Sequence, residues 1–222
     1  MWNKMNKFTG WVDVPLSEGG LHEAMQVAEN LRKVKIDVAF TSHLERAHQT
    51  LLTTLSLQEA TGVFLHESEH AEMNYEAELT DGEIPIYTTW LLNERHYGSL
   101  QGTRKDLAEQ KYGHDQVLEW RRGYSVRPPE GESLKDVYER AMPYFTERIL
   151  PEVLKDQNVL VVAHGNTLRA IIKDLDGISD DKISELEISP AVSFIYTVKD
   201  GKLEKEFSQY TFNREIQWKY DR

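Results

Sequence analysis

The sequence contains no cysteine, and this absence excludes several kinds of chemistry. Without thiols the chain forms no disulfide framework, no thiolate nucleophile, and no zinc or iron–sulfur site with cysteine ligands. The N-terminus also lacks the pattern of a secretory signal peptide. The composition therefore fits a reducing compartment, and we expect a cytoplasmic protein.

Long apolar runs and an excess of basic residues are missing as well. No run approaches the roughly 18 apolar residues that span a bilayer, so a membrane protein is not expected. The chain has 26 Lys and Arg against 37 Asp and Glu, a net charge of −11, which argues against non-specific nucleic-acid binding. Its 222 residues, 40% of them hydrophobic, fit one globular domain with room for an insertion.

The charge is unevenly distributed along the chain. Residues 95–127 contain seven Lys or Arg and four Asp or Glu, a net of +3, whereas residues 66–83 contain seven acids and no base. A cationic stretch in an acidic protein is typical of an anion-binding site, because Arg offers paired donors to phosphate or carboxylate. A solvated helix face explains the same stretch equally well.

Periodicity predicts alternating helices and strands. Helices are expected at 16–34, 44–57, 133–154 and 167–175, and strands at 36–42, 158–163 and 192–198. Ser133 and Asp136 form a capping-box pattern, and residues 158–163 are almost all apolar, as in a strand buried on both faces. We therefore predict an α/β fold with a doubly wound, mostly parallel sheet between helices, in one domain over residues 1–222. An acidic insertion is expected at about 66–89.

Two candidate functional residues follow predicted strands, where ligands of such sheets bind. His164 precedes a glycine and a helix N-terminus, which favours an anion, although a lone histidine is more often structural. Arg46 lies in the first turn of a predicted helix, where a plain surface arginine is the commoner case. Position modestly favours a functional role for His164.

The cationic stretch contains two further candidate groups. Glu94, Arg95, His96 and Tyr97 stand together before a glycine, as in a binding loop. Arg121-Arg122 is either a phosphate clamp or an exposed basic patch, and these residues alone do not decide between the two.

A zinc-protease pattern, H-E-x-x-H, occurs at His66, Glu67 and His70. The pattern requires an apolar-faced helix and a third ligand, whereas this copy lies in a strongly acidic stretch. We regard it as a chance match and expect no metal, with a zinc hydrolase as the remote alternative.

A family resemblance covers almost the whole chain. The residues that carry it are, in order, Trp2-Asn3, Phe8-Thr9-Gly10-Trp11, Pro15-Leu16-Ser17-Glu18, Thr41-Ser42 with Arg46-Ala47, Leu92-Asn93-Glu94-Arg95-His96-Tyr97-Gly98, Leu100-Gln101-Gly102, Tyr112-Gly113, Trp120-Arg121-Arg122, Pro128-Pro129, Gly131-Glu132-Ser133-Leu134, and Ala163-His164-Gly165-Asn166 with Leu168-Arg169-Ala170. In this order the chain resembles the 2,3-bisphosphoglycerate-dependent phosphoglycerate mutases of the histidine phosphatase superfamily. The motif from Leu92 to Gly98, with Trp120-Arg121-Arg122, is specific to the mutases.

The resemblance implies an isomerase of glycolysis and gluconeogenesis that interconverts 3-phosphoglycerate and 2-phosphoglycerate through a phosphohistidine. It implies 2,3-bisphosphoglycerate as the priming phosphoryl donor, and it leaves a homo-oligomer open. Glu94 is then the expected proton donor and acceptor, and Arg46 and His164 stabilise the transferring phosphoryl group. The substrate contacts implied in the same way are Asn3, Thr9, Gly10, Arg95, Tyr97, Lys105, Arg121, Arg122, Gly165 and Asn166.

One departure from the family pattern concerns the nucleophile. Family members have an apolar strand ending in Arg-His-Gly just before the Trp-Asn that stands here at Trp2-Asn3, and this His becomes phosphorylated. No Arg-His-Gly occurs in the 222 residues. We expect an N-terminal fragment, or a chain begun at an internal Met, that lacks a central strand and is inactive by itself. The alternative is an inactive relative that still binds phosphoglycerates, and a plain phosphatase is the nearest competitor within the superfamily.

Overall fold

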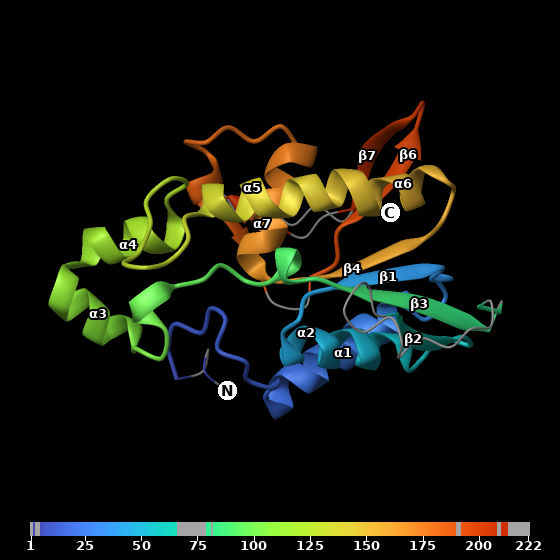
Figure 1. The fold of residues 1–222 in the computed structure, drawn as a ribbon, viewed down its shortest axis with the longest axis horizontal. Coiled ribbons are helices and arrows are strands. Elements are labelled where there is room, and N and C mark those ends of the chain that lie inside the picture. Colours follow the sequence, from blue (N-terminus) through green and yellow to red (C-terminus); the bar gives the residue numbers. More distant parts are fainter. Residues whose placement is uncertain are drawn as a thin grey trace.

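A four-stranded parallel sheet forms the centre of the protein (Figure 1). The structure is a computed structural model that describes residues 2, 5–65, 79–80, 82–189, 192–207 and 210–212. The strands are β1 (Val38–Thr41), β2 (Thr61–Leu65), β3 (Glu83–Thr88) and β4 (Val159–Val162), in the order β2-β3-β1-β4. Because β1 and β4 are parallel neighbours, with Thr41 opposite Val162, their carboxyl ends meet at one edge of the sheet.

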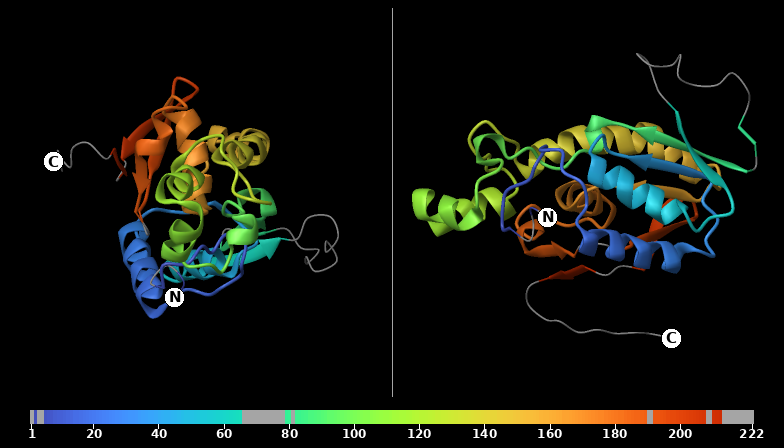
Figure 2. Two further views of the ribbon diagram at one scale, coloured as in Figure 1. Left: turned by 90° about the vertical axis from the view of Figure 1, so that its left-hand side faces the viewer. Right: turned by 90° about the horizontal axis from the view of Figure 1, so that it is seen from below.

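Helices cover both faces of this sheet, which confirms the predicted α/β class (Figures 1 and 2). One face carries α1 (Glu18–Leu31) and α2 (Glu45–Leu55), and the other carries α5 (Leu134–Tyr144), α6 (Leu150–Leu154) and α7 (Gly165–Leu175). These helices correspond to the predicted ones, with ends that differ by up to three residues. The site described below lies beyond the carboxyl ends of β1 and β4.

The alternation of side chains along β1 supplies both layers of the core. Val38 and Phe40 pack in a cluster with residues of α5 and α7, whereas Ala39 faces Leu51 and Leu55 of α2. All five side chains are buried, with exposed fractions of 5% or less. The two layers therefore fix the end of β1 firmly between α2 and α7.

The segment predicted as one helix at 133–154 consists of three consecutive pieces. Its N-terminus has the predicted capping box between Ser133 and Asp136. The α-helical pattern is interrupted by one π-turn at Phe145–Ile149 between α5 and α6. Pro151 has no N–H with which to continue α-helical bonds into this stretch.

The prediction that β4 is buried on both faces is wrong, because all four residues are only half-buried. Among the described strands β4 pairs with β1 alone, so it is an edge strand. The strand predicted at 192–198 is β6 (Ile195–Lys199), which forms a separate antiparallel hairpin with β7 (Lys202–Phe207) around the predicted turn Asp200-Gly201. A second small sheet pairs β5 (Leu186–Ile188) with β8 (Tyr210–Phe212).

The acidic insertion predicted at 66–89 is described only in part. Residues 66–78 and 81 lie outside the described residues, and so does the zinc-protease pattern at His66, Glu67 and His70. Residues 83–88 form β3, an inner strand whose Ile84 and Ile86 are buried in the cluster with Leu51 and Leu55 of α2. This part of the predicted insertion therefore belongs to the central sheet.

The cationic stretch forms a loop and two short helices at one end of the molecule (Figure 1). These helices are α3 (Lys105–Tyr112) and α4 (His114–Arg122), joined at Gly113. They pack on an apolar cluster that includes Phe8, Leu100 and Trp120. Within the described ranges, no helix is long and apolar enough to cross a membrane.

Candidate functional site

Glu94 lies in the loop that follows β3 and the short 3-10 turn Trp90–Leu92. Its Oε1 accepts hydrogen bonds from the backbone N–H of Arg95 at 2.7 Å and from Nδ2 of Asn166 at 2.9 Å. Among the described residues, no donor contacts Oε2, which points toward Gly165, 4.0 Å from where a Cβ at that glycine would lie. One carboxylate oxygen is thus anchored and the other is open, as a group that exchanges protons with a ligand requires.

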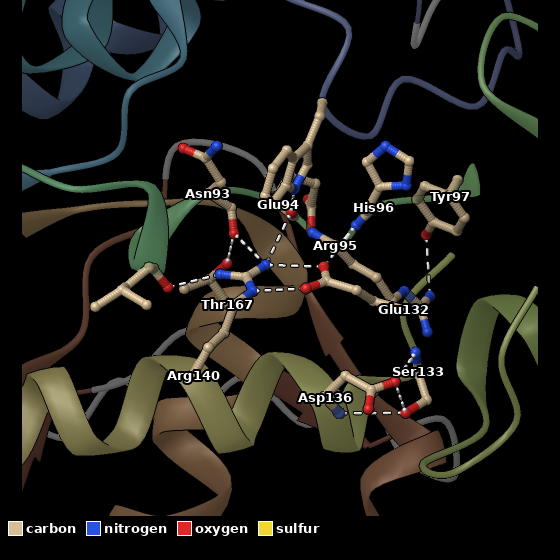
Figure 3. Close-up of polar contacts among 12 residues, drawn as sticks. Asn93, Glu94, Arg95, His96, Tyr97, Glu132, Ser133, Asp136, Arg140 and Thr167 are labelled. Carbon is tan, nitrogen blue, oxygen red and sulfur yellow. Dashed lines mark hydrogen bonds and ion pairs between the residues drawn. The ribbon is translucent and has the colours of Figure 1, made fainter. Parts of the chain in front are cut away.

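The backbone around Glu94 is held by Arg140, which projects from α5 (Figure 3). The Arg140 guanidinium donates to the carbonyls of Leu91, Asn93 and Glu94 at 2.6, 2.9 and 3.0 Å, and to the Glu132 carboxylate at 2.8 Å. Glu132 in turn accepts the backbone N–H of His96 at 2.8 Å. The carbonyl of Glu94 also accepts a hydrogen bond from the indole of Trp11. These contacts hold the loop before and after Glu94.

Arg46 lies in the first turn of α2 and ties the N-terminal loop to the sheet. Its guanidinium donates to the carbonyls of Gly10 and Val12 at 2.7 and 3.1 Å. Gly10 has φ +55°, in the left-handed region that favours glycine, and a Cβ there would also displace the side chain of Gln101. Burial lowers the pKa of Arg46, and the negative charge of Glu94 opposes this effect only in part. Thr9, also predicted as a site residue, directly precedes Gly10.

His164 ends the loop after β4, and the residue is 8% exposed. Burial lowers its pKa well below the ordinary value, and the positive charges of Arg46 and Arg140 act in the same direction. We therefore treat its imidazole as neutral. Gly165 and Asn166 begin α7, so the helix N-terminus lies beside Glu94.

Arg95 is fully buried beside the phenol ring of Tyr97. Its Nη2 donates to the hydroxyl of Tyr97 at 3.0 Å and to the carbonyl of Arg121 at 2.7 Å. Nε and Nη1 are buried and have no hydrogen-bond partner in the described part of the chain. A buried guanidinium with two free nitrogens is costly unless an anion completes it.

Further cations surround Arg95. Burial lowers the pKa of Lys105, and the charges of Arg121 and Arg122 add to this effect, so the three side chains lie near one another. Burial, with the charges of Arg95 and Arg122, also lowers the pKa of Arg169 to about 10. Arg122 forms an ion pair with Glu187 at 2.7 Å. Part of the cationic stretch therefore forms a positive region, at Arg95, Lys105, Arg121 and Arg122. Arg104 and Arg127, in contrast, are more than half exposed and pair with Asp106 and Asp136.

The structure brings most of the predicted site residues together. Glu94 contacts Asn166 and lies beside Gly165, and Arg95 contacts Tyr97 and Arg121. Arg46 contacts Gly10, and His164 lies at the same edge of the sheet. The charges of Arg121 and Arg122 act on Lys105, which brings these residues into the same region. Asn3 lies outside the described residues. The residues that the structure describes hold no group of three or more His, Asp or Glu placed to bind a metal ion.

Sequence analysis assigned no role to Arg140, Glu132, Trp11 or Arg169. Each of these residues makes a hydrogen bond to a residue far away in the chain. Arg140, for example, lies on α5 and donates hydrogen bonds to carbonyls in the loop after β3. Glu132, Trp11 and Arg169 do stand in the family motifs quoted above, which was the available signal. Arg140 stands in none of them.

Comparison with known proteins gives concordant matches. The histidine phosphatase superfamily (branch 1) matches residues 1–77 and 74–209. The 2,3-bisphosphoglycerate-dependent phosphoglycerate mutase of Methanosarcina mazei is 43% identical over 90% of this chain and 86% of its own. The 2,3-bisphosphoglycerate-dependent phosphoglycerate mutase 1 of Gloeobacter violaceus is 46% identical over 88% of each chain.

Solved structures show the same fold at lower identity. "Mycobacterial hydrolase 1" superimposes with a TM-score of 0.74 at 21% identity, over 93% of this chain and 91% of its own. Bacillus stearothermophilus YhfR superimposes with a TM-score of 0.72 at 22% identity, over 97% and 92%. These similarities support the arrangement of sheet and helices alone.

Proposed function

Because the chain belongs to the histidine phosphatase superfamily, branch 1, and to the phosphoglycerate mutases within it, we propose that it recognises 2- and 3-phosphoglycerate for their interconversion. The observation that carries the proposal is the buried guanidinium of Arg95, with two nitrogens that lack protein partners among the described residues. A small ligand that bears both a carboxylate and a phosphate supplies the missing acceptors and neutralises the surrounding cations.

Recognition of the ligand is assigned to two groups of residues. The positive region formed by Arg95, Lys105, Arg121 and Arg122 takes the carboxylate-bearing end. Thr9, Gly10 and Tyr97, together with Gly165 and Asn166 at the N-terminus of α7, line the remainder, and Asn3 is assigned by resemblance only. Arg46 and His164 stand at the strand ends to hold the transferring phosphoryl group, since stabilising its charge is the main demand of such reactions.

Glu94 is the proposed proton carrier. Its Oε1 is held by Asn166 and by its own neighbour's N–H, while Oε2 is open. In this position Oε2 takes the proton of the attacking substrate hydroxyl and returns a proton to the leaving oxygen. The Arg140 and Glu132 contacts keep its backbone in place during both transfers.

Turnover requires a phosphoryl-carrying histidine, and we propose that none of the eight histidines in these 222 residues fills this role. The family's strand ending in Arg-His-Gly would supply it. Among the described strands, one edge of β4 is unpaired, and His164 follows the end of β4. This free edge supports the proposal that a further strand carries the phosphorylated histidine. The cationic site fits a bisphosphorylated ligand, and 2,3-bisphosphoglycerate, when bound, supplies the priming phosphoryl group.

The test compares the 222-residue chain with a chain extended by a relative's N-terminal strand and Arg-His-Gly. The extended chain is expected to form 2-phosphoglycerate from 3-phosphoglycerate, stimulated by 2,3-bisphosphoglycerate, while the 222-residue chain only binds. An extended chain that folds and binds but has no mutase activity contradicts the mutase and favours the second candidate, a phosphoglycerate-binding relative. Release of inorganic phosphate without isomerisation would instead identify a phosphatase.

A further inference from the structure

Ser42 and His164 form a buried pair at the carboxyl ends of the two neighbouring strands. Ser42 directly follows β1 and is fully buried, and His164 follows β4 by two residues. The hydroxyl oxygen of Ser42 lies 2.7 Å from Nε2 of His164. The hydroxyl of Thr41 donates to the carbonyl of Val162 at 2.9 Å, so the two strand ends are also fixed to each other.

The surroundings of Ser42 determine which atom carries the proton of this hydrogen bond. The Ser42 oxygen already accepts the backbone N–H of Leu44 at 3.2 Å. Its hydroxyl proton needs an acceptor as well, because the residue is fully buried and a buried donor without a partner is destabilising. In the described part of the chain, Nε2 of His164 is the acceptor within reach.

A hydroxyl that donates to Nε2 leaves the imidazole proton on Nδ1. Nδ1 has no hydrogen-bond partner among the described residues, and His164 keeps an exposed fraction of 8%, so a ligand is the partner we assign to Nδ1. The charges of Arg46 and Arg140 face His164 and disfavour a second proton, and His48 acts in the same direction when it is protonated. Burial lowers the pKa of His164 further.

We propose that Ser42 is a positioning residue that holds His164 as the neutral tautomer protonated at Nδ1. His164 then offers the ligand one N–H donor that does not depend on imidazolium formation. That the acceptor is a phosphoryl oxygen rests on the proposed function. If so, phosphoglycerate binding does not weaken through titration of His164 as the pH rises through about 6.5, the ordinary histidine pKa.

Long-range ¹H–¹⁵N correlation of the histidine rings tests the tautomer directly in the ligand-free 222-residue protein. The eight histidines are distinguished by comparison with His164→Gln. We expect a protonated, pyrrole-type Nδ1 and an unprotonated, pyridine-type Nε2 for His164, unchanged between pH 5.5 and 8. A protonated Nε2, or a ring that gains a second proton within this range, overturns the proposal.

Three variants separate the role of Ser42 from a general structural effect. Ser42→Ala is expected to lose the pure Nδ1–H pattern, whereas Ser42→Thr keeps the hydroxyl and restores it. Thr41→Val removes the neighbouring hydroxyl and leaves the pattern unchanged. A Ser42→Ala protein with the parent pattern contradicts the proposal. If this variant does not fold, the parent titration and Ser42→Thr still decide. No ligand is present, so failure here is distinct from failure of phosphoglycerate binding.

Discussion

Replacement of Arg140 by Met removes the group that holds the Glu94 loop, and its effect follows from the contacts of the guanidinium. The side chain is 8% exposed, and it pairs with Glu132, whose side chain is 21% exposed. Loss of one partner from a buried pair costs about 3–5 kcal/mol, and the lower end applies because Glu132 keeps some solvent and the N–H of His96.

The carbonyls released by Arg140 add a smaller amount. The Asn93 carbonyl retains the hydroxyl of Thr167 at 2.6 Å, and the Glu94 carbonyl retains the Trp11 indole. Of the three acceptors, Leu91 alone is left without a donor among the described residues, which adds about 1 kcal/mol. The expected total is about 4 kcal/mol of unfolding free energy, or a fall in Tm of roughly 8–16 °C for a domain of this size.

Urea unfolding followed by circular dichroism measures this change. Arg32→Met is the matched control, because Arg32 is 64% exposed and pairs with Glu29 only at 4.0 Å, so its loss should cost less than about 1 kcal/mol. Arg140→Lys should fall between the two, since it keeps the charge without the planar fork. An Arg140→Met protein within about 1 kcal/mol of the parent would refute the reasoning.

Three further predictions concern the turn at Gly98, the cap of α5 and the anchoring of Glu94. Gly98 has φ +56°, and a Cβ there would lie 1.9 Å from the Pro129 carbonyl oxygen, so Gly98→Ala should lower the unfolding free energy in urea by more than about 2 kcal/mol; equal stability would disprove the stated clash. Burial alone raises the pKa of Asp136, but hydrogen bonds from Arg127 and from the N-cap Ser133 lower it from 3.8 to about 2. The stability that ionised Asp136 contributes is therefore present above pH 3.8 and is lost as the pH falls toward 2. Asp136→Asn should reduce this loss of stability in acid, as measured by thermal unfolding at a series of pH values, and identical pH curves for the two proteins would contradict the prediction. Asn166→Ala removes the side-chain donor to the anchored carboxylate oxygen and should weaken 3-phosphoglycerate binding about tenfold in calorimetry, whereas unchanged affinity would show that this anchor is dispensable.

Local pattern was sufficient to predict α1, α2, α7, β1 and β4, but not β2, β3, α3 or α4. The Ser133 capping box and the apolar periodicity of α1, α2 and α7 are local signals, and the structure confirms them. The half-burial of β4 was not predictable in this way, because an apolar strand reads alike at a sheet edge and inside a sheet. The π-turn at Phe145–Ile149 was also missed, since a register shift within a helix leaves the apolar periodicity almost unchanged.

The candidate site was predictable where chemistry follows a strand end or a family motif. Arg46 lies in the first turn of the helix that follows β1, His164 lies two residues after β4, and the structure places both at one edge of the sheet. The hydrogen bonds of Arg140 to the Glu94 loop were not predictable, because the acceptors are backbone carbonyls some 47 residues away from it in the chain. A backbone carbonyl has no sequence signature. The tautomer of His164 likewise depends on how a buried hydroxyl is surrounded in three dimensions.

The central claim is that the positive region recognises a phosphorylated three-carbon acid. Isothermal titration calorimetry of 3-phosphoglycerate into the 222-residue protein tests this claim most directly. The account predicts saturable binding to one site, weakened about tenfold or more by Lys105→Met. Lys111→Met, which removes an exposed lysine from the same helix, should bind as the parent does. A flat trace with folded parent protein, or equal loss in both variants, would contradict the account.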